Sequence, residues 1–595
     1  MAMGLACAIG ATGAIAGANQ GRALVRAAPT DFDDAYMYLR YARNALDGHW
    51  FVWNPGEAPI HGVTSPLHLV AVTLLRWWAP GLGDAAVLQL ASGLAALALL
   101  IVLAMLCARL GPDSRPYLER LLLWGGVLVL GFGSREAFFF HAHSGMDTML
   151  AALANALVAL AALRLAERPS RARALAAAVL GLFAIEARPD DVIIATLCPV
   201  LALGLLAPAR RAATATTTTT AATTTRLRGA ALTWAGAFGG LLLVDVALKW
   251  WLLGTPVPLA FYAKRPGYYR GFAGEFTWNP FLFLEVALAT VWPFLVATMV
   301  FARRDRVRVL LVLLVPAAAS VVALFSVNHI MGHLGRFFFP ASPLIVAAGA
   351  AATGRWLGAE PQTETGATPA RGHRFTGAIP ARLAGALLAL LGGAWALEAA
   401  GRRHERRAET QELAPLGGYR VSAAAPLPEL DSWEASQDVA LLAAAAPPGT
   451  TFAMSEHGLV GARAPRAVLI DVLGLHDRTF ALAGFSAAEL WRRRPEVIWM
   501  PHPDHTQMLR DILDSEELWR HYVFYPDAFT YGLALRRDGP HFAILAELFS
   551  RRWRAAYPGV RPEDHVAQRA ASPDAGWLVG GAPWATNTPT VRARP

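Results

Sequence analysis

The chain has 595 residues, of which 55% are apolar and only 16% are charged, and its mean hydropathy is +0.37. Soluble domains carry about a quarter charged residues, so this composition excludes an ordinary soluble protein. The net charge of +9 does not indicate nucleic-acid binding, because the Arg residues occupy short loops between apolar runs and no basic stripe has interleaved aromatic residues.

An acidic segment follows a first, weakly apolar helix predicted over residues 2–18. This segment covers residues 31–66 and places Asp33 and Asp34 just before an amphipathic helix predicted over residues 35–46. Carboxylates at the edge of a bilayer are costly and usually functional. The alternative is that they form a solvated helix cap, since Asp is a common N-cap residue.

The next apolar run, residues 65–80, is short, opens with Ser-Pro and ends Arg-Trp-Trp-Ala-Pro. If it crossed the membrane, every later Arg-rich loop would change sides. We therefore predict an amphipathic helix that lies in the outer interface of the bilayer.

Ten further apolar runs have lengths typical of membrane-spanning helices. With the first helix they make about eleven spans, so the predicted fold is a polytopic α-helical membrane protein. The runs are Ala85–Leu110, Leu121–Phe132 (or on to Phe140), Met146–Leu165, Ala174–Ile185, Val192–Leu206, Gly229–Leu253, Phe281–Phe301, Val307–Ser326, Phe337–Ala352 and Leu383–Leu397.

The loops between these runs alternate in charge. Every second loop is rich in Arg, in the segments 109–120, 164–173, 210–228, 303–308 and 355–374. Loops rich in Arg and Lys face the cytoplasm. The opposite, extracytoplasmic side then receives residues 31–84, 141–145, 186–191, 254–280, 328–336 and everything after Gly401. A Thr-rich stretch, residues 213–225, is predicted as a linker in a cytoplasmic loop.

Charged and polar residues return after Gly401 and predict a small extracytoplasmic α/β domain over residues 401–560. Residues 1–400 form the predicted membrane domain, with 31–84 as its first outer loop. Residues 561–595, rich in Pro, Ala and Arg, are predicted to be a disordered tail. In the α/β domain, β-like runs at 450–454, 467–471, 496–500 and 531–535 alternate with helical patterns at 433–445, 487–494 and 505–513.

The unusual polar residues converge on the outer side of the membrane. Adjacent acids such as Asp33 and Asp34 raise one another's pKa, which brings one of them nearer the range of a catalytic base. Cations would meet the charge that develops on a departing phosphate, and the candidates are Lys264, Arg336 and Arg188. The candidate substrate-binding residues are Tyr36, Arg40, Asp147, Asp190 and His333.

Structural alternatives exist for most of these residues. Asp147 is a possible cap of the helix that follows it, and Arg188 and Asp190 a possible ion pair within a tight turn. Arg336 and Lys264 are possible interfacial residues that extend to the membrane surface. His141, His143, His329 and His333 have spacings that only weakly indicate a metal, and we favour polar loop or acceptor contacts for them.

Several of these segments together resemble a known family. The string DDAYMYLRYARNALDGHWFVWNPGEAPIHGVTSPL, which begins at Asp33, resembles the first extracytoplasmic loop of GT-C glycosyltransferases. The similar group within that family comprises the mycobacterial terminal β-arabinofuranosyltransferases and related polyprenyl-phosphate mannosyltransferases. Later motifs agree in order, namely SGMDT, EARPDD, PVPLAFYAK, HLGRFFFPASPL and, in the soluble domain, VLIDVLGLHD.

The resemblance implies an inverting transfer of a sugar from a polyprenyl-phosphate donor outside the cytoplasm, by a multi-pass protein of the bacterial inner membrane. The sugar would be arabinofuranose or another pentose or hexose, and the acceptor a cell-envelope glycan or lipid. A catalytic Asp in the first loop is implied, for which we prefer Asp33 as the base, with Asp34 orienting the acceptor or a divalent cation. Lys264 and Arg336 would contact the donor phosphate. Two departures are that Asp147 replaces the usual Glu and that Asn328 stands where relatives often carry an acid.

Two other classes of function are compatible with the pattern. A transporter or flippase of lipid-linked saccharides would place charged residues near the bilayer midplane, often in repeated halves, whereas these acids lie at one edge. A non-catalytic scaffold for envelope assembly would make Asp33 and Asp34 replaceable.

Overall fold

The computed structural model describes residues 32–111, 116–207, 220–265, 279–326, 332–353, 427, 430, 432–502 and 505–570. By its internal contacts the chain divides into two compact units. The first contains Gln89–Val244 and Trp278–Thr410, and the second contains Pro29–Leu88, Asp245–Thr277 and Gln411–Pro595. The predicted boundary at residue 400 lies close to the end of the first unit at Thr410. The first outer loop and Asp245–Thr277, by contrast, belong to the second unit with the C-terminal region.

Seven helices among the described residues are long and apolar enough to cross a membrane. This agrees with a polytopic, membrane-embedded helical protein. The predicted spans at 2–18 and 383–397 lie outside the described residues. The seven segments are α4 (Asp84–Leu110), α7 (Thr148–Glu167), Pro189–Leu206 with α9 (Val192–Leu201) at its centre, most of α11 (Thr220–Leu253), most of α13 (Asn279–Phe301), α14 (Val307–Leu324), and His333–Thr353, which ends in α15 (Ser342–Thr353).

Two of the predicted membrane spans are not single long helices in the structure. The run after residue 121 folds as α5 (Tyr117–Leu128), a π turn η1 (Val129–Gly133) and α6 (Glu136–His143), with a bend of 89° before α6. Counted as one broken span, this pair raises the number of candidate spans to eight. The run predicted at residues 174–185 lies in α8 (Arg171–Ala187), whose 17 residues span about 25 Å, less than a bilayer core of about 30 Å.

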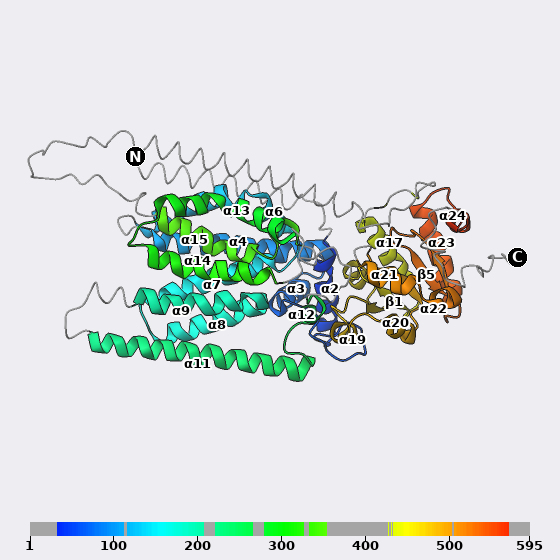
Figure 1. Ribbon diagram of the computed structural model, residues 1–595, viewed down its shortest axis with the longest axis horizontal. Coiled ribbons are helices and arrows are strands. Elements are labelled where there is room, and N and C mark those ends of the chain that lie inside the picture. Colours follow the sequence, from blue (N-terminus) through cyan, green and yellow to red (C-terminus); the bar gives the residue numbers. More distant parts are fainter. Residues whose placement is uncertain are drawn as a thin grey trace, which may run out of the picture. The chain divides into compact units, whose positions relative to one another are not determined.

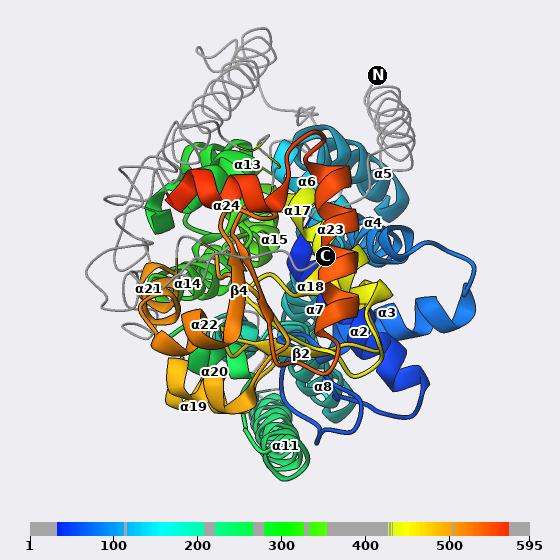
Figure 2. The same cartoon turned by 90° about the vertical axis from the view of Figure 1, so that its right-hand side faces the viewer.

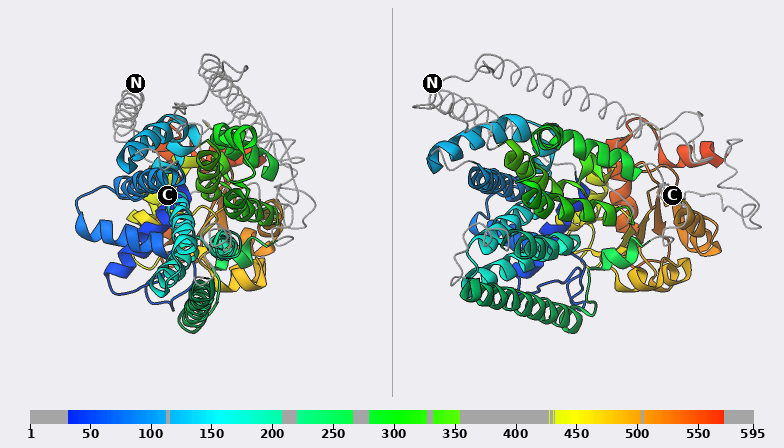
Figure 3. Two further views of the ribbon diagram at one scale, coloured as in Figure 1. Left: turned by 90° about the vertical axis from the view of Figure 1, so that its left-hand side faces the viewer. Right: turned by 60° about the vertical axis from the view of Figure 1, so that its left-hand side comes forward.

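Small side chains allow the helices of the first unit to pack closely. Helix α7 lies beside α8 and α9, and α13 beside α15 (Figures 1 and 3). The buried face of α7 is rich in Ala. A Cβ added to Gly349 of α15 would be 2.8 Å from the backbone of Phe294 in α13, so only Gly permits this approach. Apolar side chains on the outward faces, such as Met299 and Val322, remain exposed, as expected of surfaces that contact lipid.

The second unit contains a five-stranded mixed sheet with the strand order β2-β1-β3-β5-β4. Strand β1 (Thr451–Met454) pairs in parallel with β2 (Val468–Asp471) and β3 (Val497–Trp499), whereas β5 (Leu533–Arg536) pairs antiparallel with β3 and with β4 (Tyr522–Tyr525). Four strands overlap predicted runs, and β4 is an addition to them.

Helices cover both faces of this sheet (Figure 2). One face packs against α19 (Arg478–Ala483), α20 (Ala487–Arg493), α21 (Thr506–Leu513) and α22 (Glu516–His521), which share an apolar core with the strands. The opposite side carries α17 (Ser432–Ala445), α18 (Gly458–Arg463) and α23 (Phe542–Ala556). The segment predicted as a disordered tail begins with a helix, α24 (Pro562–Ala570), and residues after 570 lie outside the description.

The segments before residue 88 also form helices in the second unit. Helix α2 (Asp33–Leu46) begins two residues earlier than predicted, so Asp33 and Asp34 lie in its first turn and Phe32 is the N-cap. Helix α3 (Pro66–Trp78) has 13 residues and a length of about 20 Å, too short to cross a bilayer core of about 30 Å. Its exposed Trp77 and Trp78 suit the predicted interfacial helix.

Candidate functional site

Asp33 is held by two hydrogen bonds from backbone N–H groups. Its Oδ2 accepts the N–H of Gly458 and its Oδ1 accepts the N–H of Leu459, each at 2.8 Å. Burial raises the pKa of Asp33, while His457 and these two hydrogen bonds act in the opposite direction. A Cβ on Gly458 would overlap the Asp33 carbonyl, so the close approach of α2 and α18 requires glycine there. Both carboxylate oxygens are therefore committed to joining these helices, which favours a positioning role rather than the predicted role as base.

Asp34 and Glu456 are the more accessible carboxylates near Asp33, and both are half-buried. Burial, followed by the charge of Asp33, raises the pKa of Glu456 to about 7, and Asp34 also raises it. His502 and His457 lower it. Three carboxylates thus interact electrostatically in this part of the second unit, and one of them takes up a proton near neutral pH.

The parallel strands explain why Glu456 lies there. Glu456 follows the carboxyl end of β1, and His502 follows β3, its neighbour in the sheet. The N–H of His502 donates to Ser455 Oγ at 3.0 Å, and Ser455 Oγ donates to Glu456 at 3.3 Å. Ligands of α/β sheets commonly bind beyond the carboxyl ends of parallel strands. The acids of α2 therefore lie at the edge of the sheet where a substrate is expected.

A buried histidine–carboxylate pair lies behind this edge. Asp471, at the end of β2, accepts the N–H groups of Leu473 and His476 at 2.9 and 2.6 Å. His457 Nδ1 donates to the Ser455 carbonyl at 2.7 Å and lies 3.7 Å from Asp471 Oδ1. Burial lowers the pKa of His457, but the charges of Asp471 and Asp33 outweigh it, and the net pKa is raised. His457 therefore interacts with two carboxylates whose charges favour its protonated form.

Arg40 and Tyr36 differ from their prediction as substrate-binding residues. Arg40 is 1% exposed, and its guanidinium donates to the carbonyls of Trp53, Gly461, Ala464 and Ala467 and to Asn54 Oδ1, at 2.7 to 3.3 Å. The Tyr36 ring is buried against Trp433, with centroids 5.4 Å apart. Arg40 is saturated by these acceptors, so both residues hold α2 in the second unit.

A second polar cluster lies in the first unit. Arg336 and Asp147 are both buried, with 4.0 Å between Nη2 and Oδ1. Arg188 donates through Nε and Nη2 to the two carboxylate oxygens of Asp190, each at 3.1 Å, and through Nη1 to the Arg336 carbonyl at 3.4 Å. The guanidinium groups of Arg188 and Arg336 both lie over the Phe337 ring, at 5.3 and 5.6 Å.

The turn before Arg336 is strained. Leu334 has φ +48° within the single turn η4 (His333–Gly335), and Gly335 has φ +70°. A positive φ at Leu is costly and persists only where the surroundings enforce it. His141 Nε2 donates to the Leu334 carbonyl at 3.1 Å, and a Cβ on Gly335 would be 2.8 Å from the carbonyl of Phe283. These contacts fix the position of Arg336.

The purely structural roles considered above for these polar residues agree with the structure in some cases and not in others. Asp147 occupies the N-cap position of α7, but its side chain makes no capping hydrogen bond. Arg188 and Asp190 do form the ion pair, which leaves less of the Arg188 guanidinium for a donor phosphate. Lys264, half-buried just after α12 (Leu259–Ala263), belongs to the second unit, whereas Arg336 and Arg188 belong to the first. His333 is half-buried, and His329 and Asn328 lie outside the described residues.

Sequence reasoning missed Glu456, His457 and His502. A signal for them was present, because polar residues directly after predicted parallel strands are candidates for a site. Within the described part of the chain, no group of three or more His, Cys, Asp and Glu side chains is arranged to hold a metal. Neither a scan against models of known protein families nor a search among curated proteins found a match to this chain.

Proposed function

We propose that this protein is an inverting glycosyltransferase that moves a sugar from a polyprenyl-phosphate donor to a cell-envelope glycan or lipid acceptor. The proposed location is the outer side of the bacterial inner membrane, with the second unit extracytoplasmic. The observation that carries the proposal is the group of carboxylates at the strand edge, in which Glu456 has its pKa raised to about 7. Where neighbouring carboxyl groups titrate at different pH, one can stay protonated and donate a hydrogen bond while another stays ionised and accepts a proton.

Roles follow from the contacts of each acid. Asp33 is committed to the N–H groups of Gly458 and Leu459, so Asp34 is the proposed base, which keeps the catalytic Asp in the first loop as the family resemblance implies. Glu456, half protonated near pH 7, would orient the acceptor hydroxyl. The acceptor oxygen attacks the anomeric carbon, Asp34 takes the proton, and the bond to the donor phosphate breaks.

Two of the three cationic side chains predicted to contact the donor phosphate remain candidates. Arg188 is engaged by Asp190 and by a backbone carbonyl, whereas Arg336 and Lys264 remain candidates. Arg336 follows a turn fixed by the contacts of Leu334 and Gly335, and a guanidinium can meet phosphate with two parallel hydrogen bonds. The exposed apolar faces of α11, α13 and α14 suit a donor whose lipid chain remains in the bilayer. Dependence on a divalent cation stays a prediction.

A donor screen tests the proposal. The full chain in lipid nanodiscs is supplied with polyprenyl-phosphate arabinofuranose, or with the corresponding mannose donor, and a panel of glycan acceptors. Mass spectrometry detects the product, and the anomeric configuration is read by NMR. We expect one donor to give a product of inverted configuration with release of polyprenyl phosphate. Folded protein that transfers no sugar but moves the donor across a vesicle membrane would contradict the proposal and favour a flippase. Inactivity in both assays would favour a scaffold.

A further inference from the structure

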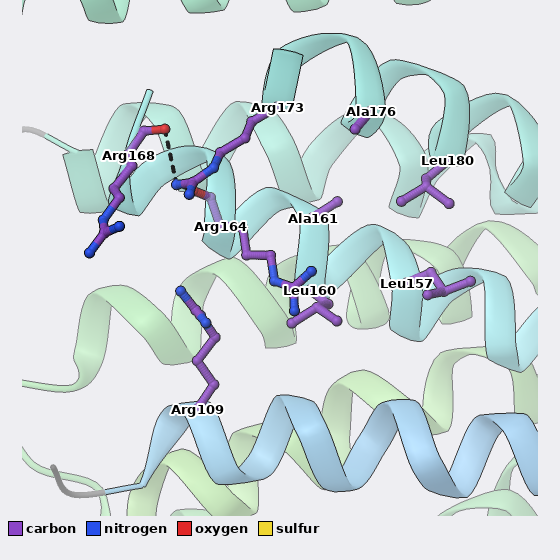
Figure 4. Close-up of a pocket in the computed structure, with 9 residues that line it drawn as sticks. All are labelled: Arg109, Leu157, Leu160, Ala161, Arg164, Arg168, Arg173, Ala176 and Leu180. Atoms are coloured by element: carbon purple, nitrogen blue, oxygen red, sulfur yellow. Dashed lines mark hydrogen bonds between the residues drawn. The ribbon is translucent and has the colours of Figure 1, made fainter. Parts of the chain in front are cut away.

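A basic cavity lies in the first unit, away from the residues discussed so far. Its volume is about 570 Å³, and its walls come from the C-terminal ends of α4 and α7 and from the first half of α8 (Figure 4). Four of its nine lining residues are arginines, and the other five are Leu or Ala. The lining, all of it described, contains no acidic residue. The four arginines are Arg109, Arg164, Arg168 and Arg173.

The cavity has a cationic end and an apolar end. The lining residues of α7 and its C-cap are at positions 157, 160, 161, 164 and 168, and those of α8 are at 173, 176 and 180, so each set lies along one helix face. The arginines gather where these helices meet the connecting loops, whereas Leu157 and Leu180 lie farther into the helices. Figure 4 shows the guanidinium groups of Arg109 and Arg164 turned toward the same space.

The positive charge at this end exceeds the negative charge beside it. Glu167 forms an ion pair with Arg109. Arg173 donates to the carbonyls of Arg164 and Arg168, at 3.0 and 3.2 Å, which holds its guanidinium at the end of α7. Arg164 and Arg168 are exposed. An anion that entered this end would therefore meet a preformed group of cations.

We infer that this cavity binds the phosphate headgroup of an anionic phospholipid, with the lipid chain lying along the apolar wall formed by Leu157, Leu160 and Leu180. Basic pockets between membrane helices commonly bind anionic headgroups on the cytoplasmic side, which is where the Arg-rich loops are predicted to lie. The apolar half of the cavity favours a lipid over a free phosphate ion, because an ion would leave that wall unused.

This site is distinct from the cluster around Asp147. Asp147 directly precedes α7 and Arg164 lies near its other end, a separation of about 25 Å along a helix that rises 1.5 Å per residue. Arg188 follows the last residue of α8, and Arg173 lies in its first turn. The basic cavity and the Asp147 cluster thus lie at opposite ends of the same helix pair, and the lipid site does not depend on the proposed transferase activity.

Lipid retention measured by native mass spectrometry tests the inference. The full chain is titrated in detergent with phosphatidylglycerol, which is anionic, or with phosphatidylcholine, which is zwitterionic. The test variant is Arg164→Gln with Arg168→Gln, and the matched control is Arg303→Gln with Arg304→Gln, a pair that is also exposed and outside the cavity. We expect the wild type and the control to prefer phosphatidylglycerol. The test variant should bind it roughly thirtyfold more weakly, which corresponds to about 1 kcal/mol for each of the two basic residues removed near a membrane surface.

Two further measurements distinguish a lipid headgroup from free phosphate and test the apolar end of the cavity separately from its cationic end. Inorganic phosphate at the same concentration should not displace the lipid, and Leu157→Ser with Leu180→Ser should weaken lipid binding while melting as the wild type does. Equal binding of phosphatidylglycerol by the Arg164/Arg168 variant and the wild type would overturn the inference. So would displacement by inorganic phosphate, or equal binding of the two phospholipids by the wild type.

Discussion

Asp33 and Arg40 hold α2 in the second unit through bonds to backbone groups of residues 458–467. Hydrogen bonds to charged groups contribute about 1.5–3 kcal/mol each, and a buried polar group that loses its partner costs about 1–3 kcal/mol. These two charged residues, about two helical turns apart, therefore both contribute to the stability of the unit. Asp34, next to Asp33 in the sequence, has the exposure that a base needs.

The stability of the second unit should depend on pH through His457. Its pKa is raised above the ordinary value of 6.5, so its stabilising contribution is full below pH 6.5 and is lost as the pH rises through the folded-state pKa. Glu456 acts in the same direction between pH 4.5 and about 7. His476, with its pKa lowered by burial, opposes them below pH 6.5. His457 is therefore the histidine of this cluster whose titration lowers stability as the pH rises above 6.5.

We expect the melting temperature of the wild type to fall as the pH rises above 6.5, with a contribution from His457 of at most about 1.4 kcal/mol per pH unit. In His457→Gln this fall should be smaller, whereas His521→Gln, at an exposed position, should keep it. Thermal unfolding followed by tryptophan fluorescence gives the profiles. A slope that persists unchanged in His457→Gln would show that another group is responsible.

At the scale of elements, the contact between α2 and α18 depends on glycine. The Cβ of any other residue at 458 would overlap Asp33, and at 461 it would lie 2.9 Å from the Trp53 ring. Overpacking of a tight contact costs about 1–3 kcal/mol.

Gly458→Ala should therefore lower the melting temperature and weaken protection of the N–H of Leu459 from hydrogen exchange. Gly81→Ala is the matched control, because a Cβ there meets nothing within 4 Å, and it should behave as the wild type. Hydrogen–deuterium exchange of peptides that span 456–463 makes the comparison. Equal exchange and melting in the two variants would mean that α18 can shift without cost.

The elements that could be predicted from the sequence are those that are long or have a strong hydrophobic periodicity. Most apolar spans agree with the structure to within a few residues, since a bilayer sets the length of a helix that crosses it. Strand β4 was missed because it directly follows α22, with no Gly or Pro between them. Helix α24 was missed although Pro562 begins it and Glu563 and Asp564 lie in its first turn, which are start signals for a helix. The composition of residues 561–595, rich in Pro, Ala and Arg, led to the prediction of a disordered tail in spite of these local signals.

The candidate site was predictable only in part. The acids of α2 stood out in the sequence because they adjoin apolar runs. The structural role of Arg40 did not, because three of its acceptors are carbonyls more than 420 residues away. Glu456 carried only the general signal of a polar residue after a predicted strand, because its interaction with Asp33 joins residues far apart in the sequence.

For the whole molecule, the proposed function requires that the C-terminal part of the chain lies outside the cytoplasm. Cysteine labelling in intact cells tests this, in a chain whose 3 native cysteines are replaced by Ser. Cys introduced at Arg492, which is 71% exposed on its side chain, should react with a membrane-impermeant maleimide. Cys introduced at the exposed Arg304 should react only after permeabilisation. The reverse pattern would invert the orientation and rule out an extracytoplasmic site.

We propose that Asp34 takes the proton of the acceptor while Asp33 positions α2. The most direct test is the initial rate of sugar transfer from the polyprenyl-phosphate donor by the wild type, Asp34→Asn and Asp33→Asn, each with its melting temperature. We predict that Asp34→Asn melts as the wild type does and loses at least about a hundredfold in rate, the lower range for a general base. Asp33→Asn should melt at a lower temperature, because one N–H then loses a carboxylate acceptor. Transfer by Asp34→Asn at the wild-type rate would contradict the account.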